Sequence, residues 1–326
     1  MKLSCGGGMK TQRILQDTMG MVFLVGISLL VPVSAGAAST PVGAENCQKC
    51  HETEHGVWEG TRHFSSFKEV HKMPEAKAIL AAVGGATSMK KHETCLLCHY
   101  TVTPDPATVE LAPTSGPSCE SCHGAASDWI TVHNDYGGPT VTRETEPPAH
   151  KAQRIKAAQG AGMRWPFMKF ELASTCMGCH AMTQSGLDST TLGKMLDAGH
   201  PLKSEWEYIR YSQGTVRHRF YPPDITVNNV MTPAELARNY VIGAAAKLVS
   251  AKAALAKSTH PTYQAAQQQR LNEATTVLSA VKSVPEAAAL VASPTEQNAK
   301  KLVAAVEDKD LSGDVGALLP DPATYK

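Results

Sequence analysis

Aromatic side chains are scarce in this 326-residue chain, at 6% of all positions. The signatures of several common enzyme classes are missing as well. The sequence has no phosphate-binding loop, no dinucleotide-binding glycine fingerprint and no Gly-x-Ser-x-Gly nucleophile elbow. A formal net charge of +1 gives no basic excess of the kind that nucleic-acid binding requires. These absences argue against nucleotide-dependent enzymes, serine hydrolases and nucleic-acid-binding proteins.

Cysteine is present in an arrangement that leaves nothing for disulfides. Eight of the nine cysteines fall into four Cys-x-x-Cys-His frames. The frames are Cys47–His51 with Cys50, Cys95–His99 with Cys98, Cys119–His123 with Cys122, and Cys176–His180 with Cys179. The ninth, Cys5, lies in an N-terminal segment that we expect to be removed. No cysteine pair therefore remains for a disulfide or for a zinc site.

The frame Cys-x-x-Cys-His is the attachment site of c-type haem. Both thiols add to the vinyl groups of one porphyrin, and the adjacent histidine supplies one axial bond to the iron. Four chance occurrences are negligible in a chain of this composition. We therefore predict four haem c groups held by the eight frame cysteines, with His51, His99, His123 and His180 as axial ligands.

The N-terminal segment has the pattern of a secretion signal. Lys10 and Arg13 precede an apolar stretch from Met19 to Val33, and Ala35–Ala37 forms a small-residue cleavage site. Because covalent haem attachment takes place outside the cytoplasm, we predict that residues 1–37 are a signal peptide and that the protein is periplasmic. The alternative is a retained membrane anchor, which would give membrane contact. An extracellular location is less favoured.

Composition divides the remaining chain in two. All four frames lie in a segment rich in Gly, Pro and Thr with little sustained helical periodicity, where macrocycles would replace an ordinary side-chain core. After about Asp224, cysteine disappears and Ala, Gln, Lys, Leu and Val dominate. We predict a mainly α fold with extensive loops. It would consist of a multihaem cytochrome c domain at 38–224 and an α-helical hairpin or bundle at 225–326.

Capping signals place the helices of the second region. Thr232-Pro-Ala-Glu235 predicts a helix to about Lys257. A second helix is predicted from Pro261 to about Lys282, and a third after a capping box at Ser293–Glu296, ending near Glu307. Residues from Asp308 onward are expected to form a loose tail. This region would cover haem edges from water, or offer a docking surface.

Histidine is more abundant than the four frames require. Nine others are present: His55, His63, His71, His92, His133, His150, His200, His218 and His260. A second histidine on each iron gives a six-coordinate, low-spin haem that transfers electrons with little rearrangement. A distal methionine would instead raise the reduction potential. The surplus of histidine favours bis-histidine ligation.

Two elements of the sequence resemble the tetrahaem cytochrome c-554 family. They are Cys47–His51 followed by Trp58-Glu-Gly-Thr61-Arg-His63, and Cys119-Glu-Ser-Cys122-His123-Gly124 followed ten residues later by His133. The resemblance covers about residues 44–185, including the order and approximate spacing of the four frames. In that family the two matching histidines are distal haem ligands. The resemblance therefore implies this role for His63 and His133.

The segment after the fourth frame is similar to larger multihaem relatives. Gly199-His200-Pro201 and Arg217-His218-Arg219 match elements that precede an Ala-rich helix there. This similarity implies that His200 and His218 are the other distal ligands, with His71 and His92 in reserve.

The resemblance implies a periplasmic electron carrier that works between redox partners, a donor oxidoreductase and a membrane or periplasmic acceptor. Only 24 residues separate Cys95 from Cys119, so we expect the second and third haems to be close. One alternative is an enzyme that converts a small nitrogen oxide at a five-coordinate haem, for which the haem at His99 is the candidate. Another is a subunit of an extracellular cytochrome filament.

Overall fold

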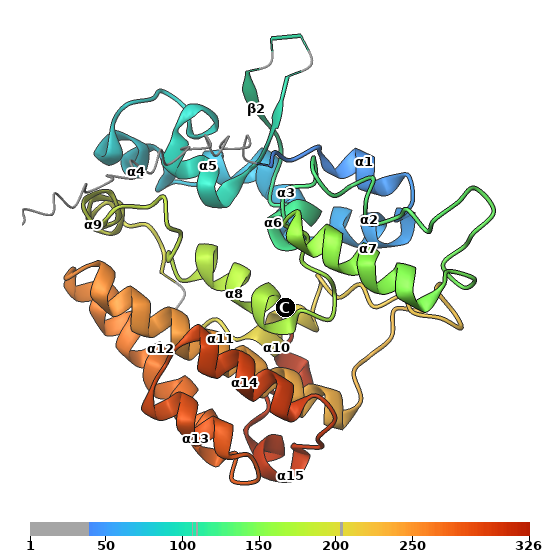
Figure 1. The fold of residues 1–326 in the computed structure, drawn as a ribbon. Coiled ribbons are helices and arrows are strands. Elements are labelled where there is room, and N and C mark those ends of the chain that lie inside the picture. The colour runs from blue at the N-terminus through green and yellow to red at the C-terminus, as the bar shows by residue number, and fades with distance from the viewer. Residues whose placement is uncertain (1–38, 106, 109, 203–204) are drawn as a thin grey trace, which may run out of the picture. The chain divides into compact units, whose positions relative to one another are not determined.

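The computed structural model describes residues 39–326 except 106, 109, 203 and 204. The predicted signal peptide at 1–37 lies outside these residues. The described chain is mostly helical with long connecting loops, which confirms the predicted fold class (Figure 1). Within it, every helix is too short or too polar to cross a bilayer.

Short helices make up the part of the chain that carries the four motifs. They are α1 (Ala44–Gln48), α2 (Glu52–Glu59), α3 (Arg62–Glu69), α4 (Ala76–Val83), α5 (Glu93–His99), α6 (Cys119–His123), α7 (Pro148–Gly160), α8 (Lys169–His180), α9 (Ser189–Asp197) and α10 (Tyr208–Ser212). Side-chain caps fix several starts. Thr61 accepts the backbone N–H of Phe64 at the start of α3, and Ser118 and Ser121 form a capping box on α6.

A two-stranded antiparallel hairpin joins the second motif to the third. Strand β1 (Thr101–Pro104) pairs with β2 (Leu111–Ser115), with Thr101 opposite Ser115 and Pro104 opposite Leu111. At its base, the Thr101 hydroxyl donates to the carbonyl of Gly116 at 3.0 Å. The hairpin thereby separates α5 from α6 along the chain while fixing the entry to the third motif.

Five helices form the C-terminal region. They are α11 (Pro233–Lys257), α12 (Pro261–Ala280), α13 (Pro285–Ala292), α14 (Glu296–Val306) and α15 (Ser312–Val315). The capping box at Thr232 and Glu235 is present, and the first helix has the predicted bounds. Proline at the first helical position starts α11, α12 and α13, where its missing N–H costs no hydrogen bond.

Three details of this region differ from the prediction. The short helix α13 was not predicted, because eight residues give too little periodicity to recognise. The N-cap of α14 is Thr295 rather than Ser293, which instead ends α13. The expected loose tail is ordered, because Leu311 and Val315 are both 0% exposed and pack into the main core.

The main core joins the C-terminal helices to the helix that carries the fourth motif. Phe170, Ala173 and Met177 of α8 pack in the same cluster as the buried residues of α11 and α12. Small side chains of α11 such as Ala244 and Ala245 keep the helices close. In Figure 1, α8 accordingly lies against α11, while its other contacts reach α5 and α6. The Ala-rich helices thus support one motif directly.

Candidate haem-binding site

Three of the four motifs occupy the last turn of a helix. The histidine is the final helical residue in α5, α6 and α8, at His99, His123 and His180. The first motif begins in α1 with Cys47, and His51 follows that helix. Residues three apart lie on neighbouring positions of a helix surface. The helical turn therefore brings both thiols of a frame to one side, where a single porphyrin edge can meet them.

Each motif histidine faces one histidine from elsewhere in the chain. The distances between ring centres are 6.4 Å for His51–His133, 6.1 Å for His180–His63, 6.1 Å for His99–His200 and 6.2 Å for His123–His218. The structure thus brings together all eight histidines that the sequence proposes as ligands, as four pairs.

The spacing of these pairs suits an iron between two imidazoles. A metal–imidazole bond is about 2 Å long, and a ring nitrogen lies roughly 1 Å from the ring centre. Two such bonds in line separate the ring centres by about 6 Å. The observed separations of 6.1 to 6.4 Å match this value in every pair. The residues present therefore fit four haem groups.

Backbone carbonyls orient four of the eight rings through Nδ1. The contacts join His123 to Arg164 O at 2.8 Å, His133 to Ile130 O at 2.7 Å, His200 to Pro201 O at 2.9 Å and His218 to Val216 O at 2.6 Å. A ring that donates from Nδ1 leaves the lone pair of Nε2 for a metal. Each of the pairs at His51, His99 and His123 contains at least one ring held in this way.

Burial keeps several of these imidazoles neutral. It lowers the pKa of His99 to about 4, and the neighbouring His200 acts in the same direction. Burial likewise lowers the pKa of His123 to about 4, against the hydrogen bond to Arg164. The pKa of His63 is lowered by burial too. Neutral imidazole is the form that binds iron, so at neutral pH no proton competes at these rings.

The residues around His63 explain the Trp-x-x-Thr-x-His element. The indole N–H of Trp58 donates to Pro117 O at 2.9 Å and joins α2 to the entry of the third motif. Thr61 caps the helix on which His63 lies. Gly116 approaches the same helix so closely that a Cβ atom there would stand 2.0 Å from His63 O. Cap, indole and glycine together fix the position of His63.

Glu120 and Gly124 have equally specific tasks in the third motif. The buried Glu120 carboxylate accepts the backbone N–H groups of Val42, Gly43 and Ala126 at 2.9, 2.8 and 2.8 Å. Burial raises its pKa, and these three hydrogen bonds oppose the rise. Gly124 has a φ of 94°, and a Cβ there would lie 2.3 Å from Gly162 O. The contacts with Val42 and Gly43 could not be predicted from the local sequence, because these residues lie 78 and 77 positions before Glu120.

A buried ion pair lies behind His133. Arg154 donates from Nε and Nη2 to the Glu146 carboxylate at 2.8 and 2.6 Å, and from Nη1 to the carbonyl of His133 at 2.5 Å. The Arg154 guanidinium also lies 4.8 Å from the ring centre of Tyr136. These contacts hold the backbone of His133 in place. Nothing in the local sequence pattern indicated this role for either member of the pair.

Thiol contacts give the neighbour relations between motifs. Cys47 contacts Cys119, Cys98 contacts Cys179, and Cys176 interacts electrostatically with Cys122. The contact with Cys179, followed by burial, raises the pKa of the Cys98 thiol. The order of neighbours is therefore first, third, fourth, second. The short spacing from Cys95 to Cys119 predicts that the second and third motifs are close. The Thr101 hydroxyl, two residues after His99, lies 3.0 Å from the Ser118 hydroxyl at the start of the third motif, and the thiol contacts add a link from the second motif to the fourth.

The remaining histidines have other surroundings in the described chain. Nδ1 of His150 lies 2.7 Å from Glu146, and Nε2 of His260 lies 3.1 Å from Asp197. The ring of His55 packs edge-on against Trp58. Ring contacts of the described residues join none of these, nor His71 or His92, to a motif histidine.

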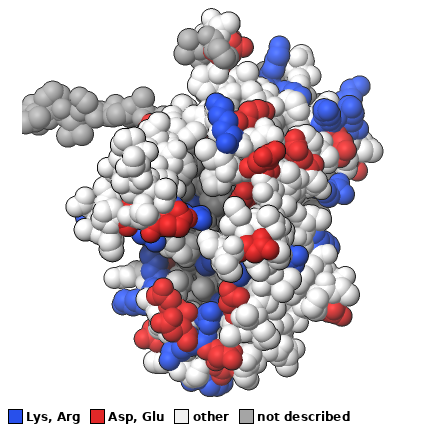
Figure 2. Space-filling view, turned by 90° about the vertical axis from the view of Figure 1, so that its right-hand side faces the viewer, with Lys and Arg blue, Asp and Glu red and all other residues white. Residues whose placement is uncertain are grey.

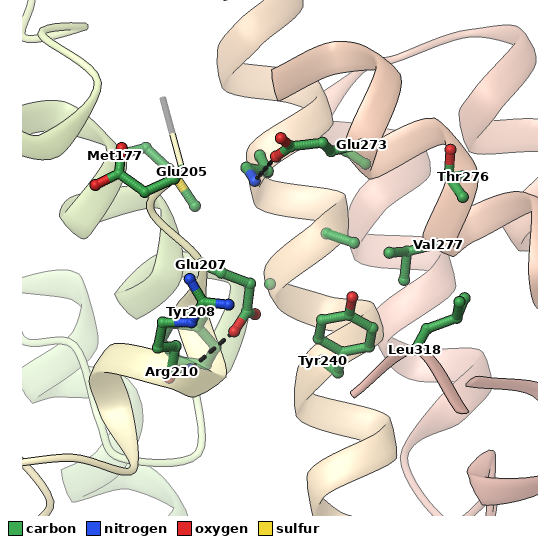
Figure 3. Close-up of a pocket in the computed structure, with 14 residues that line it drawn as sticks. Met177, Glu205, Glu207, Tyr208, Arg210, Tyr240, Glu273, Thr276, Val277 and Leu318 are labelled. Carbon is green, nitrogen blue, oxygen red and sulfur yellow. Dashed lines mark hydrogen bonds and ion pairs between the residues drawn. The ribbon is translucent and has the colours of Figure 1, made fainter. Parts of the chain in front are cut away.

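A cavity of about 430 Å³ lies beside the fourth motif, between α10, α11 and α12 (Figure 3). Its lining includes Met177, Glu207, Lys247 and Glu273. None of the proposed haem ligands or attachment cysteines lines it. In Figure 3, Met177 and Glu207 lie on one side and Glu273 on the other.

Comparison with known families agrees with the motif analysis. Residues 46–124 match the family of cytochrome c554 and c-prime. This segment contains the first three motifs and His63, and it ends before the fourth. Searches of curated proteins and of solved structures gave no match. Motifs and match together define a c-type cytochrome with covalently bound haem c. The matched segment is of the cytochrome c554 type, which confirms the resemblance inferred from the sequence.

Proposed function

We propose that this protein is a periplasmic tetrahaem c-type cytochrome that passes single electrons between redox partners. The observation that carries the proposal is the set of four histidine pairs, each with ring centres 6.1 to 6.4 Å apart. Each pair joins one motif histidine to one of His63, His133, His200 and His218. These eight side chains would be the axial ligands.

Each haem, when bound, supplies a one-electron iron couple. The chain's own residues do the rest. They fix ring tautomers through backbone carbonyls, and they exclude water with aromatic side chains. Trp206 stacks on His180 at 5.3 Å between ring centres, and Trp129 packs edge-on against His133 at 5.2 Å. Because the attachment sites are neighbours in the order first, third, fourth, second, we infer that the four redox sites follow one another in that order.

The pair at His99 favours a carrier over an enzyme. An enzyme that converts a small nitrogen oxide needs an open coordination position, and the haem at His99 was the candidate for it. His200 lies opposite His99 at 6.1 Å and is oriented through Pro201 O. A ring in that place would close the sixth position, which leaves electron transfer as the chemistry that the arrangement supports.

The surface is compatible with transient redox partners. On the face in Figure 2, acidic and basic side chains are interspersed, and neither sign covers a broad area. On this face, such a mixture offers no basic patch for nucleic acid. Export rests on the predicted signal peptide. A donor oxidoreductase and a membrane or periplasmic acceptor are the proposed partner classes.

Haem counting and spin state test this proposal together. The full chain should be produced in a host that attaches haem c outside the cytoplasm, and fractionated. We expect the protein in the periplasmic fraction, with four haems per chain by the pyridine haemochrome assay. Its oxidised electron paramagnetic resonance spectrum should contain low-spin ferric signals alone. Fewer haems, or a high-spin signal from a stoichiometric fraction of the iron, would refute the tetrahaem bis-histidine assignment.

A further inference from the structure

One face of α12 forms hydrogen bonds with the end of α8, the helix that carries the fourth motif, and with the two residues that follow it. Tyr263, Gln267 and Arg270 lie on this face, and each is 0% exposed. The Tyr263 hydroxyl donates to Met182 O at 3.2 Å, and the Gln267 amide donates to Ala181 O at 3.1 Å. Both acceptors directly follow His180. Nη2 of Arg270 contacts the sulfur of Met177 at 2.8 Å.

Arg270 is a buried charged side chain that forms no hydrogen bond with a carboxylate among the described residues. Nη2 of Arg270 has a second contact, to the Ser250 hydroxyl at 3.3 Å, whereas Nε and Nη1 have no hydrogen-bond partner among the described residues. Glu273 forms its ion pair with Lys247 at 2.5 Å. Buried arginines are ordinarily paired with an anion. Among the described residues, no carboxylate forms a hydrogen bond with the buried guanidinium of Arg270.

This charge persists at physiological pH. Burial lowers the pKa of Arg270 to about 10, which still leaves the guanidinium protonated near neutrality. The other charged groups that face it are limited: Lys247 and Glu273 compensate each other on the cavity side, where Figure 3 shows Glu273 in the wall opposite Met177. Arg270 is the cation in direct contact with Met177, whereas Glu205 and Glu207 line the neighbouring cavity.

We propose that Arg270 raises the reduction potential of the haem attached at Cys176 and Cys179, so that this haem holds the electron longest in the partly reduced protein. The inference rests on the proposed tetrahaem function. Met177 lies between the two attachment cysteines, so the guanidinium is one side chain away from the attachment site. Reduction adds one electron to the ferric iron, and a fixed cation in a poorly polarisable interior favours the state with less positive charge.

Two sets of variants test the effect of the charge. Arg270→Met removes the charge and keeps an unbranched side chain of similar length. Gln267→Glu and Gln267→Met form a matched pair, because both lose the amide donor to Ala181 O while only the first adds a negative charge one turn from Arg270. Spectroelectrochemical titration of each holoprotein gives the four midpoint potentials.

We expect Arg270→Met and Gln267→Glu to lower one midpoint potential by about 59 mV, a tenfold change for a one-electron couple. Gln267→Met and Arg270→Lys should leave it in place. The shifted haem should be the one whose low-spin signal changes in His63→Met, because His63 pairs with His180. If Arg270→Met fails to fold, Arg270→Gln, which also removes the charge and keeps a polar side chain, takes its place in the titration.

The outcomes separate this inference from the proposed function. A wild-type protein with fewer than four haems overturns the proposed function itself. Four haems with unchanged potentials in the variant that removes the Arg270 charge, or a shift in a haem that His63→Met does not affect, overturns the role of Arg270 alone.

Discussion

The ring of His99 lies 6.1 Å from the ring of His200, centre to centre, and the two planes meet at 58°. These residues are 101 positions apart in the sequence, and they come from the end of α5 and from the loop after α9. Backbone contacts fix the second ring, since Nδ1 of His200 lies 2.9 Å from Pro201 O. The pair is the feature that distinguishes a carrier with four closed irons from an enzyme with one open iron.

Replacing His200 by alanine should open one iron. Without the second imidazole, the haem at His99 loses its sixth ligand and becomes high-spin. We expect a new high-spin ferric signal equal to one haem of four, and binding of added cyanide or nitric oxide by that haem alone. His71→Ala is the control, because His71 is exposed and lies opposite no motif histidine. An unchanged low-spin spectrum in His200→Ala would contradict the pairing.

Arg154 should matter for the haem at His51 through His133, the proposed distal ligand. In Arg154→Met the carbonyl of His133 loses its donor, and the buried Glu146 loses its arginine partner and keeps only its contact with His150. Breaking one side of a buried ion pair is strongly destabilising. We expect a lower unfolding midpoint and a partial high-spin signal from one haem. Glu146→Gln combined with Arg154→Met should recover part of the stability but not the ligand geometry, since the donor to His133 stays absent. A destabilised protein with four unaltered low-spin signals would exclude the positioning role.

Acid should weaken the stabilising contact between Glu146 and Arg154 over a defined range of pH. The hydrogen bond from Arg154, and then that from His150, lowers the pKa of Glu146 to about 2. An unfolded glutamate has a pKa of about 4.3. The carboxylate thus stabilises the fold fully above that value, and this contribution is lost as the pH falls from about 4.3 towards 2.

The measurement compares wild type with Glu146→Gln by urea unfolding at several pH values. The wild type should be the more stable at pH 7, and the difference should shrink below about pH 4.3. If the difference in unfolding free energy between the two proteins stayed constant down to pH 2, the ion pair would not lower the pKa of Glu146.

The four Cys-x-x-Cys-His motifs could be recognised from the sequence alone, and the reason is chemical. Covalent haem attachment imposes a fixed spacing on two cysteines and a histidine, so all four motifs can be identified without knowledge of the fold. His63 was proposed as a distal ligand because Trp58-x-x-Thr61-x-His63 resembles a family element, and the structure places it opposite His180 on a helix that Thr61 caps. Helix α11 was predicted with its cap and its bounds, because a capping box and a long apolar face define it, whereas the N-cap of α14 was predicted two residues too early.

The contacts that could not be predicted from the sequence join residues that lie far apart in the chain. Three side chains make contacts far along the chain: Glu120 with the N–H of Gly43, Arg154 with the carbonyl of His133, and Arg270 with the sulfur of Met177. No local sequence pattern indicates these partners. The contact of the second motif with the fourth was not predicted for a related reason. It joins Cys98 to Cys179, which lie 81 positions apart, and no local pattern indicates such a pair.

Glu120 provides the sharpest test of these long-range contacts. Its two carboxylate oxygens accept three backbone N–H groups, from Val42, Gly43 and Ala126, and so join the start of α1 to the third motif. Glu120→Gln keeps the shape but replaces one acceptor with a donor that faces an N–H. A buried N–H without its acceptor costs about 1 to 3 kcal/mol, and we expect the free energy of unfolding to fall by that amount.

Urea unfolding of the holoprotein, followed by circular dichroism, measures the loss. Asp128→Asn is the matched control, since Asp128 is exposed on the same loop and accepts one hydrogen bond, from Ser127. A surface change of this kind should stay within about 0.5 kcal/mol. Because Cys47 and Cys119 come together where Glu120 joins the two segments, the same variant should also attach haem less completely at the first motif. Equal stability and full haem content in Glu120→Gln would mean that the contact between α1 and α6 is maintained by other groups.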